Sequence, residues 1–214
     1  CRGDLSEGFH YMEMYGSGID PEKISPLTFT IFENVALHHS WLSADFDRGP
    51  THYTKVLSAA RDTGVKHMVP FATAHMAACH LSQGNPVRAL EMIRQMESSA
   101  DQFGIWGKAL YLVVKAWAAM LKEDAPQADF YSEAACRNTL KAGGAQQYAV
   151  ALLCRGIAYK MRGNRLEAKN CLAKALDICC KFPAYQTETA CRLVQAEVLL
   201  EEGDMNCALH FLTD

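Results

Sequence analysis

The sequence predicts an all-α protein built from antiparallel helix pairs, and three observations support this. A short turn recurs at regular spacings of 39, 40 and 40 residues, at Gly84, Glu123, Gly163 and Gly203. An alanine follows each of these positions after five residues. The segments on both sides of every turn carry apolar residues at the period of a helix. A fixed period of this length is the signature of a repeat architecture.

The composition is that of a globular chain. Half of the 214 residues are apolar, 21% are charged, and the net charge is -3, which gives no bulk attraction for nucleic acid or anionic membrane. No apolar run approaches the roughly 18 to 20 residues needed to span a bilayer. The nine cysteines form no Cys-x-x-Cys pair, and most lie beside alanine or leucine in helical runs. They are typical of small buried residues in a reducing compartment, so we expect a cytoplasmic protein.

The unit at 144–183 shows the pattern most clearly. Its first helix (helix A) contains "YAVALLCRGIAYKM" and its second (helix B) contains "RLEAKNCLAKALDICC". We expect Gly163 to end helix A in a left-handed conformation, and Asn164 to start helix B. Ala168 is predicted to lie where helix B crosses helix A. Gly156, seven residues before the turn, supplies the matching small residue on helix A.

The same spacing divides the rest of the chain. A half unit at 1–18 is followed by units at approximately 25–63, 64–103, 104–143, 144–183 and 184–214, forming one solenoid that we expect to be a piece of a longer array. Helix-stopping stretches separate the units, at 61–64, 101–104, 141–144 and 181–185.

The unit at 25–63 fits the pattern less closely. Its first helix has two candidate starts, Asp20-Pro21-Glu22 and Ser25-Pro26-Leu27. Asp45 is placed at the turn, and Pro50 near the alanine position.

These features resemble tetratricopeptide repeats. The residues that match the familiar pattern are Leu152, Gly156, Tyr159, Gly163, Ala168, Leu172 and Ala175. The period of 39–40 residues exceeds the 34 of the standard repeat. In this, and in "AEVLLEEGDMNCAL" (196–209), the chain is similar to the repeat region of large bacterial transcription regulators of the MalT and LuxR type. The resemblance implies a right-handed α-α superhelix whose A helices line a concave face; it specifies architecture rather than activity.

Motifs for catalysis or cofactor binding are missing from the sequence. It contains no Walker A sequence, no dinucleotide-binding glycine motif and no His-Glu-x-x-His. We therefore expect no enzyme, no catalytic residue and no cofactor. His75 and Cys79 are spaced i, i+4 and would permit two metal ligands, but zinc sites need three or four. We interpret these two residues, His80 and the pair His38-His39 as packed or surface residues, with no metal bound.

One charged pattern suggests a binding surface. Lys108, Lys115 and Lys122 are spaced i, i+7 and i+14, and the next A helix repeats the row with Arg155 and Arg162. If A helices line a groove, these five residues form a basic strip there, with Trp117 beside it. The following A helix carries Glu188, Gln195 and Glu202 in the same row. The alternative is an ordinary solvated helix face. At the position of Lys115 and Arg155, shorter repeats of this family carry a buried leucine.

Two functions from different classes fit these features. The first is a non-catalytic sensing module of a bacterial transcription regulator, whose groove binds an effector or protein partner. The second is a scaffold that docks a peptide or helix and has no link to transcription. Either could self-associate, and neither requires this chain to touch nucleic acid or membrane.

Overall fold

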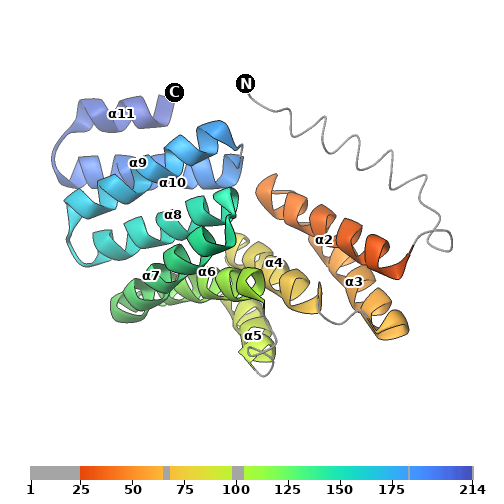
Figure 1. Cartoon of the computed structure of the whole chain (residues 1–214). Helices are drawn as coiled ribbons and strands as arrows, with labels where there is room; N and C mark the ends of the chain where they lie inside the picture. Colours follow the sequence, from red (N-terminus) through yellow and green to blue (C-terminus); the bar gives the residue numbers. More distant parts are fainter. Residues whose placement is uncertain (1–24, 65–67, 98–103, 183, 214) are drawn as a thin grey trace. The chain divides into compact units, whose positions relative to one another are not determined.

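A computed structural model describes residues 25–64, 68–97, 104–182 and 184–213. This part of the chain forms ten helices and no strand, so the all-α prediction is confirmed. The predicted half unit at 1–18 lies outside the described residues. The helices, shown in Figure 1, are α2 (Pro26–Leu42), α3 (Gly49–Thr63), α4 (Val69–Ser82), α5 (Pro86–Glu97), α6 (Ile105–Leu121), α7 (Ala125–Ala142), α8 (Ala145–Met161), α9 (Arg165–Lys181), α10 (Tyr185–Glu201) and α11 (Met205–Thr213).

The chain divides between Gly107 and Lys108 into two compact units, and each is described by itself. The N-terminal unit holds α2 to α5, and the C-terminal unit begins inside α6 and extends through α11. In each unit, helices that follow one another in the chain pack together across short turns, as in α8 with α9 and α10 with α11. This is a solenoid-like arrangement. One continuous array across both units, and its superhelical hand, stay predictions.

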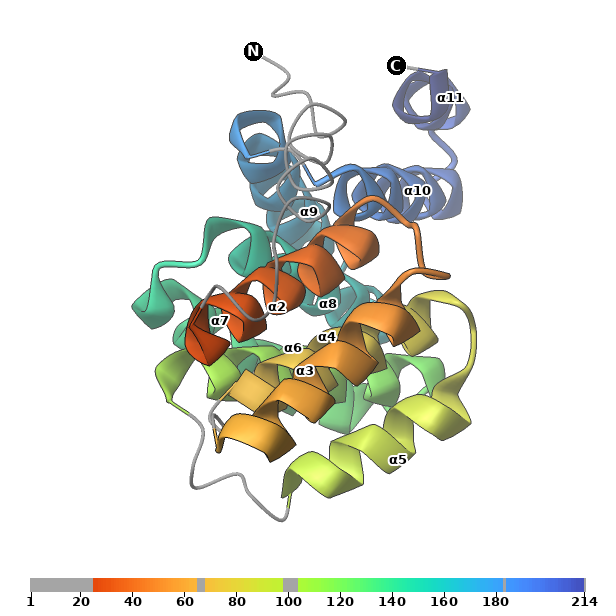
Figure 2. The ribbon, with the colours of Figure 1, turned by 90° about the vertical axis from the view of Figure 1, so that its right-hand side faces the viewer.

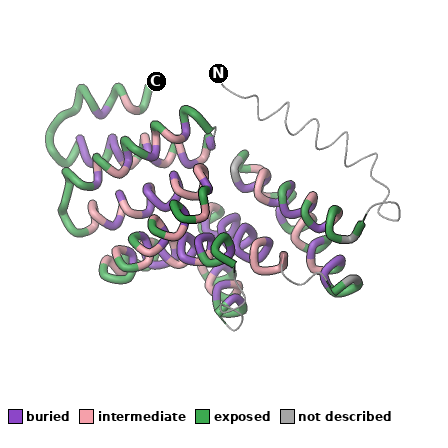
Figure 3. The backbone as a smooth tube through the Cα atoms, in the orientation of Figure 1, coloured by how far each residue is buried: buried purple, intermediate pink, exposed green. Residues whose placement is uncertain are grey.

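The positions of the buried residues recur from one helix pair to the next. In the C-terminal unit, Figure 3 shows buried residues along the sides of the helices that face one another, and exposed residues on the outer sides and at the turns. Helix α9 is an example, because Ala168, Leu172, Ala175 and Cys179 are its buried residues. These four form the apolar stripe expected for an amphipathic helix.

The turns between paired helices share one backbone conformation. Each contains one residue with positive φ: Ala44 (60°), Gly84 (70°), Glu123 (56°), Gly163 (74°) and Gly203 (82°). Glycine adopts this left-handed conformation without the steric cost that a Cβ atom adds. The predicted glycine caps are therefore confirmed, and two of the five turns adopt the same conformation without glycine.

The residue after the turn caps helix B in three of these pairs. Asp124, Asn164 and Asp204 each accept a hydrogen bond from a backbone N–H three residues ahead, at 3.1, 3.3 and 3.1 Å. Such a cap satisfies one of the N–H groups that the first turn of a helix leaves unpaired. Ser25 does the same for α2, where its hydroxyl accepts from the Thr28 N–H at 3.1 Å. Of the two candidate starts for this helix, the second is correct.

The predicted crossing points are also confirmed. The four alanines five residues beyond the turns are fully buried, namely Ala89, Ala128, Ala168 and Ala208. The closest approach is at Gly156 in α8. A Cβ atom added there would lie 2.9 Å from Leu172 Cγ and 3.3 Å from the Ala168 carbonyl oxygen. Because both distances are below ordinary contact, glycine allows α8 to pack this closely on α9.

In the unit at 25–63 the crossing residue lies next to Pro50, one position before it. Pro50 is exposed, and the buried residue is Gly49, five residues after the positive-φ Ala44. A Cβ atom added to Gly49 would contact Leu37 Cδ1 at 3.5 Å. Leu37 lies seven residues before the turn and is fully buried. Here a large residue on helix A is accommodated by glycine on helix B.

The turn conformation predicts opposite effects of two substitutions. Gly163→Ala places a Cβ atom at φ 74° and should lower the free energy of unfolding by about 1 kcal/mol. Glu123→Gly relieves the same strain and should raise it by up to about 1 kcal/mol. Urea unfolding followed by circular dichroism measures both. Gly104→Ala, at an exposed glycine without positive φ, is the control. Equal stability of Gly163→Ala and the control would contradict this explanation of the turn.

Candidate functional site

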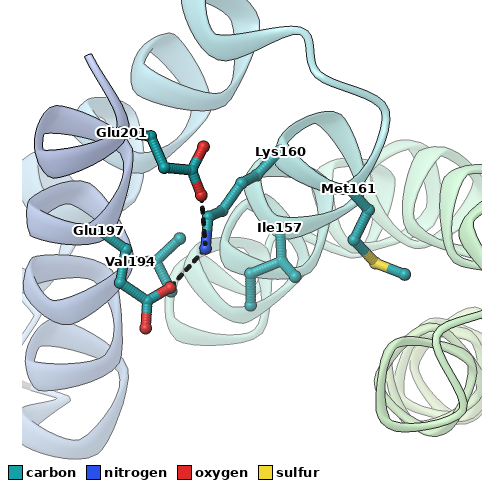
Figure 4. Close-up of a pocket in the computed structure, with 6 residues that line it drawn as sticks. All are labelled: Ile157, Lys160, Met161, Val194, Glu197 and Glu201. Carbon is teal, nitrogen blue, oxygen red and sulfur yellow. Dashed lines mark hydrogen bonds and ion pairs between the residues drawn. The ribbon is translucent and has the colours of Figure 1, made fainter.

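The two A helices α8 and α10 pack against each other and leave a pocket of ≈ 390 Å³ between them. Figure 4 shows that one wall comes from α8 and the other from α10. The lining residues are Ile157, Lys160, Met161, Val194, Glu197 and Glu201. Three of them are apolar and three are charged. The pocket can therefore hold an apolar group and a charged group side by side.

The charges of the pocket are arranged so that the carboxylates face solvent. Lys160 Nζ lies 2.6 Å from Glu197 Oε2 and 3.4 Å from Glu201 Oε1. The Lys160 side chain is 22% exposed, whereas those of Glu197 and Glu201 are 58% and 43% exposed. Burial acts to lower the pKa of Lys160, but the hydrogen bonds and charges of the two glutamates outweigh it and raise the pKa. The ammonium stays charged and largely covered. Glu201 also pairs with the exposed Arg165 at 3.3 Å, so Glu197 is the most accessible carboxylate of the pocket.

The pocket borders a buried cluster that includes residues of α6 and α7. Ala119 of α6, Ala128 of α7 and Ala158 of α8 form one buried cluster, and Met161 from the pocket packs against it. Trp117 is partly buried and lies 40 residues before Ile157, which makes it the equivalent residue of α6. Trp117 does not line this pocket, and its place in a groove and its contact with a ligand stay predictions.

The two arginines of the predicted basic strip are paired with an acidic residue of α7. Arg155 Nη1 donates to the Asp129 carboxylate, and to the Asp129 carbonyl oxygen at 2.8 Å. Its Nη2 donates to the Tyr159 hydroxyl at 3.0 Å and lies 3.7 Å from Glu133 Oε2. Arg162 pairs with the same Asp129 carboxylate. Only 14% of the Arg155 side chain is exposed, so this cation is largely buried and its charge is paired within the protein.

The lysines of the strip have other surroundings. Lys115 Nζ lies 4.7 Å from the centre of the Tyr131 ring and 5.4 Å from that of Tyr111, which are cation–π distances. Lys108 and Lys122 are exposed. The structure thus groups Lys115, Arg155 and Arg162 through contacts with α7. Ligand binding by the five residues stays a prediction.

The acidic row beside the strip is also engaged in contacts. Glu188 pairs with Arg192 at 3.1 Å, and Glu202 pairs with Lys169 at 2.7 Å. Gln195 is buried. Positions 115, 155 and 195 therefore point inward, as the leucine of shorter repeats does. The long side chains of Lys115 and Arg155 reach polar or aromatic partners from there.

The ion pairs of Asp129 predict a stability effect. Asp129→Ala leaves the largely buried guanidinium of Arg155 without its carboxylate, and should lower the free energy of unfolding by about 1–3 kcal/mol. Arg162→Ala removes an exposed partner and should cost less than about 1 kcal/mol. Urea unfolding measures both. The control is Asp177→Ala, which breaks the exposed pair with Lys181. If Asp129→Ala is no more destabilising than this control, the pairing does not stabilise the α7–α8 contact.

Two of the histidines considered as metal ligands, His38 and His75, pack together. His38 Nδ1 and His75 Nε2 share a hydrogen bond of 2.8 Å, and both rings lie near Trp41. Burial raises the pKa of the nearby Cys79 thiol to about 12, which leaves it protonated. Among the described residues, no group of three or more histidine, cysteine or acidic side chains could hold a metal ion. Sequence reasoning missed the His38–His75 contact, because the two residues lie 37 positions apart on different helices.

Burial of His75 predicts that stability depends on pH. Desolvation, and then the charge of His38, hold the pKa of His75 well below its usual value. The pKa of His80 is lowered too, by burial and by Arg88. The unfolded chain therefore takes up protons below about pH 6.5 that the folded chain does not. The free energy of unfolding should fall with pH below this value, by at most about 1.4 kcal/mol per pH unit for each histidine.

Urea unfolding at about pH 7 and about pH 5 tests this effect. His75→Gln should reduce the loss of stability at low pH, while the exposed His210→Gln should leave it unchanged. A free energy of unfolding that is the same at both pH values would contradict the prediction.

Comparisons with models of known protein families and with curated proteins found no match for this chain. Among the described residues, no helix has the length and apolar character needed to cross a membrane.

Proposed function

We propose that this chain is a non-catalytic interaction module that binds a partner segment in the pocket between α8 and α10. The observation that carries the proposal is the pocket itself. It lies on two A helices from consecutive pairs, and it combines the apolar Ile157, Met161 and Val194 with solvent-facing carboxylates. Pockets of this size with a few placed polar groups are the usual form of binding sites in proteins.

The chemistry of the pocket selects the partner segment. An apolar side chain would sit on Ile157, Met161 and Val194. A lysine or arginine next to it would reach Glu197, whose only ion pair among the described residues is with Lys160. The proposed ligand is therefore a peptide segment with an apolar residue flanked by a basic one. This differs from the acidic ligand expected from the basic strip, because Arg155 and Arg162 are paired with Asp129.

A finer proposal concerns the parent protein. The repeat length and the "AEVLLEEGDMNCAL" segment favour the sensing region of a cytoplasmic bacterial transcription regulator of the MalT and LuxR type. This rests on the sequence resemblance alone, and a scaffold with no link to transcription would use the same pocket. The adjacent coding sequence separates the two. A phosphate-binding loop upstream or a DNA-binding helix-turn-helix downstream supports the regulator.

Two pools of labelled peptides test the binding proposal. Both contain one central leucine, isoleucine or phenylalanine, and the flanking residues are lysine and arginine in one pool and aspartate and glutamate in the other. Fluorescence polarisation should show binding of the basic pool. Glu197→Lys should weaken it by about tenfold or more, a loss of about 1.4 kcal/mol or more. Glu167→Lys makes the same charge change at an exposed site on α9 and should leave binding unchanged.

Two results would contradict the proposal. One is no binding of either pool, and the other is binding of the basic pool that Glu197→Lys affects no more than Glu167→Lys. Binding of the acidic pool that is lost with Lys115→Glu would instead favour the basic strip.

A further inference from the structure

The pocket between α8 and α10 contains a cation of the protein itself, Lys160. Its ammonium lies between two carboxylates of α10, at 2.6 Å from Glu197 Oε2 and 3.4 Å from Glu201 Oε1 (Figure 4). The shorter contact is with Glu197, the carboxylate that the proposed ligand would use. A lysine or arginine of the ligand would therefore compete with Lys160 for the same group.

The repeat shows that helix packing does not require a cation at this position. Lys160 stands three residues before the positive-φ Gly163. The residue three before the turn is Met120 in α6 and Leu200 in α10. Met120 packs against the buried alanine cluster of α6, α7 and α8. An apolar side chain thus fits this position of an A helix, and the fold does not need the positive charge of Lys160.

The two glutamates also occupy positions that are apolar on the preceding A helix. Glu197 and Glu201 lie six and two residues before their turn, where α8 has Ile157 and Met161. The three charged residues of the pocket therefore form a group that the repeat does not demand. Because a partly exposed ion pair adds little to stability, the selection of a ligand is the better explanation of this group.

The geometry allows Lys160 to yield Glu197 to a ligand. Lys160 is an ammonium in the free chain, because burial, which lowers its pKa, is outweighed by the two glutamates, which raise it. Glu197 is the more exposed partner, so a second cation can approach it from solvent. When that happens, the ammonium keeps Glu201 as its partner. The competition should therefore change the affinity by a factor of about five, as expected for one exposed ion pair.

We propose that Lys160 is an internal competitor that sets how strongly the pocket selects for a basic ligand. This inference rests on the proposed function of the pocket. With Lys160 present, binding replaces one cation at Glu197 by another, so the apolar contact with Ile157, Met161 and Val194 decides which segment binds. Without Lys160, the ligand's cation would meet an unpaired carboxylate and contribute more. Lys160 is thus a specificity-determining residue that disfavours basic segments without an apolar residue.

Four affinities measured by fluorescence polarisation test this inference. The wild type and Lys160→Gln are each titrated with the basic peptide pool and with a pool in which serine replaces the flanking lysine and arginine. Lys160→Gln should tighten binding of the basic pool by about fivefold and leave the serine-flanked pool unchanged. Lys160→Met, which introduces the residue that α6 has at this position, is a second variant and should show the same difference between the pools.

Two further variants serve as controls. Lys169→Gln removes a cation of α9 that pairs with Glu202 of α10 at 2.7 Å, outside the pocket. It should leave the affinity for both pools unchanged. In a chain that already carries Glu197→Gln, Lys160→Gln should no longer tighten binding of the basic pool, because the group for which the two cations compete is absent.

Each outcome decides the inference. Equal tightening of both pools by Lys160→Gln would mean that Lys160 only restricts access, and would overturn the inference while the proposed function stands. An unchanged affinity for the basic pool, or the same tightening with Lys169→Gln, would overturn it too. Basic peptides that bind Lys160→Gln but not the wild type would support the inference and contradict the proposed function. Basic peptides that bind neither protein would contradict both.

Discussion

The close crossing of the two helices in each pair is the constraint on which the rest of the structure depends. The left-handed turn sets the direction in which helix B returns, and the alanine five residues later sets how near it comes. At Gly156 the approach is so close that even a methyl group would contact Leu172 and the Ala168 carbonyl. Because the backbones are held at this distance, one side of every A helix packs against its own B helix. Its remaining surface is left for neighbouring pairs and for ligands.

The contacts between consecutive helix pairs, which we call junctions, differ in the sign of their charged residues. Asp129 of α7 pairs with Arg162, and 40 residues later Lys169 of α9 pairs with Glu202. The positions are equivalent, but the signs are reversed. A pair carrying the wrong sign would place like charges at the junction, which costs free energy. A further 40 residues along the chain, the equivalent position holds the exposed Leu209. Each junction thus accepts a different kind of helix on the same backbone geometry.

Local chemistry explains which parts of the fold could be predicted. Gly163, Asn164 and Ala168 act within one turn of the chain, so their spacing is sufficient to place the turn, the cap and the crossing. The crossing at Gly49 could be placed only to within one position of Pro50, because Ala44 adopts positive φ without being a glycine and this leaves no signal in the sequence. The pairing of Arg155 with Asp129 depends on how α8 is rotated against α7. The pocket combines residues of α8 and α10 that are about 40 positions apart. The basic row indicated a binding surface on a different side of the same helices.

We propose that this chain binds a partner at the surface shared by α8 and α10. Methyl NMR spectra recorded while the basic peptide pool is added test it most directly. The methyl signals of Ile157, Met161 and Val194 should shift as the peptides bind, while the signal of Ile178 in α9 should stay in place. Shifts confined to Ile178 and other residues of the B helices, with the pocket methyl signals unchanged, would contradict it.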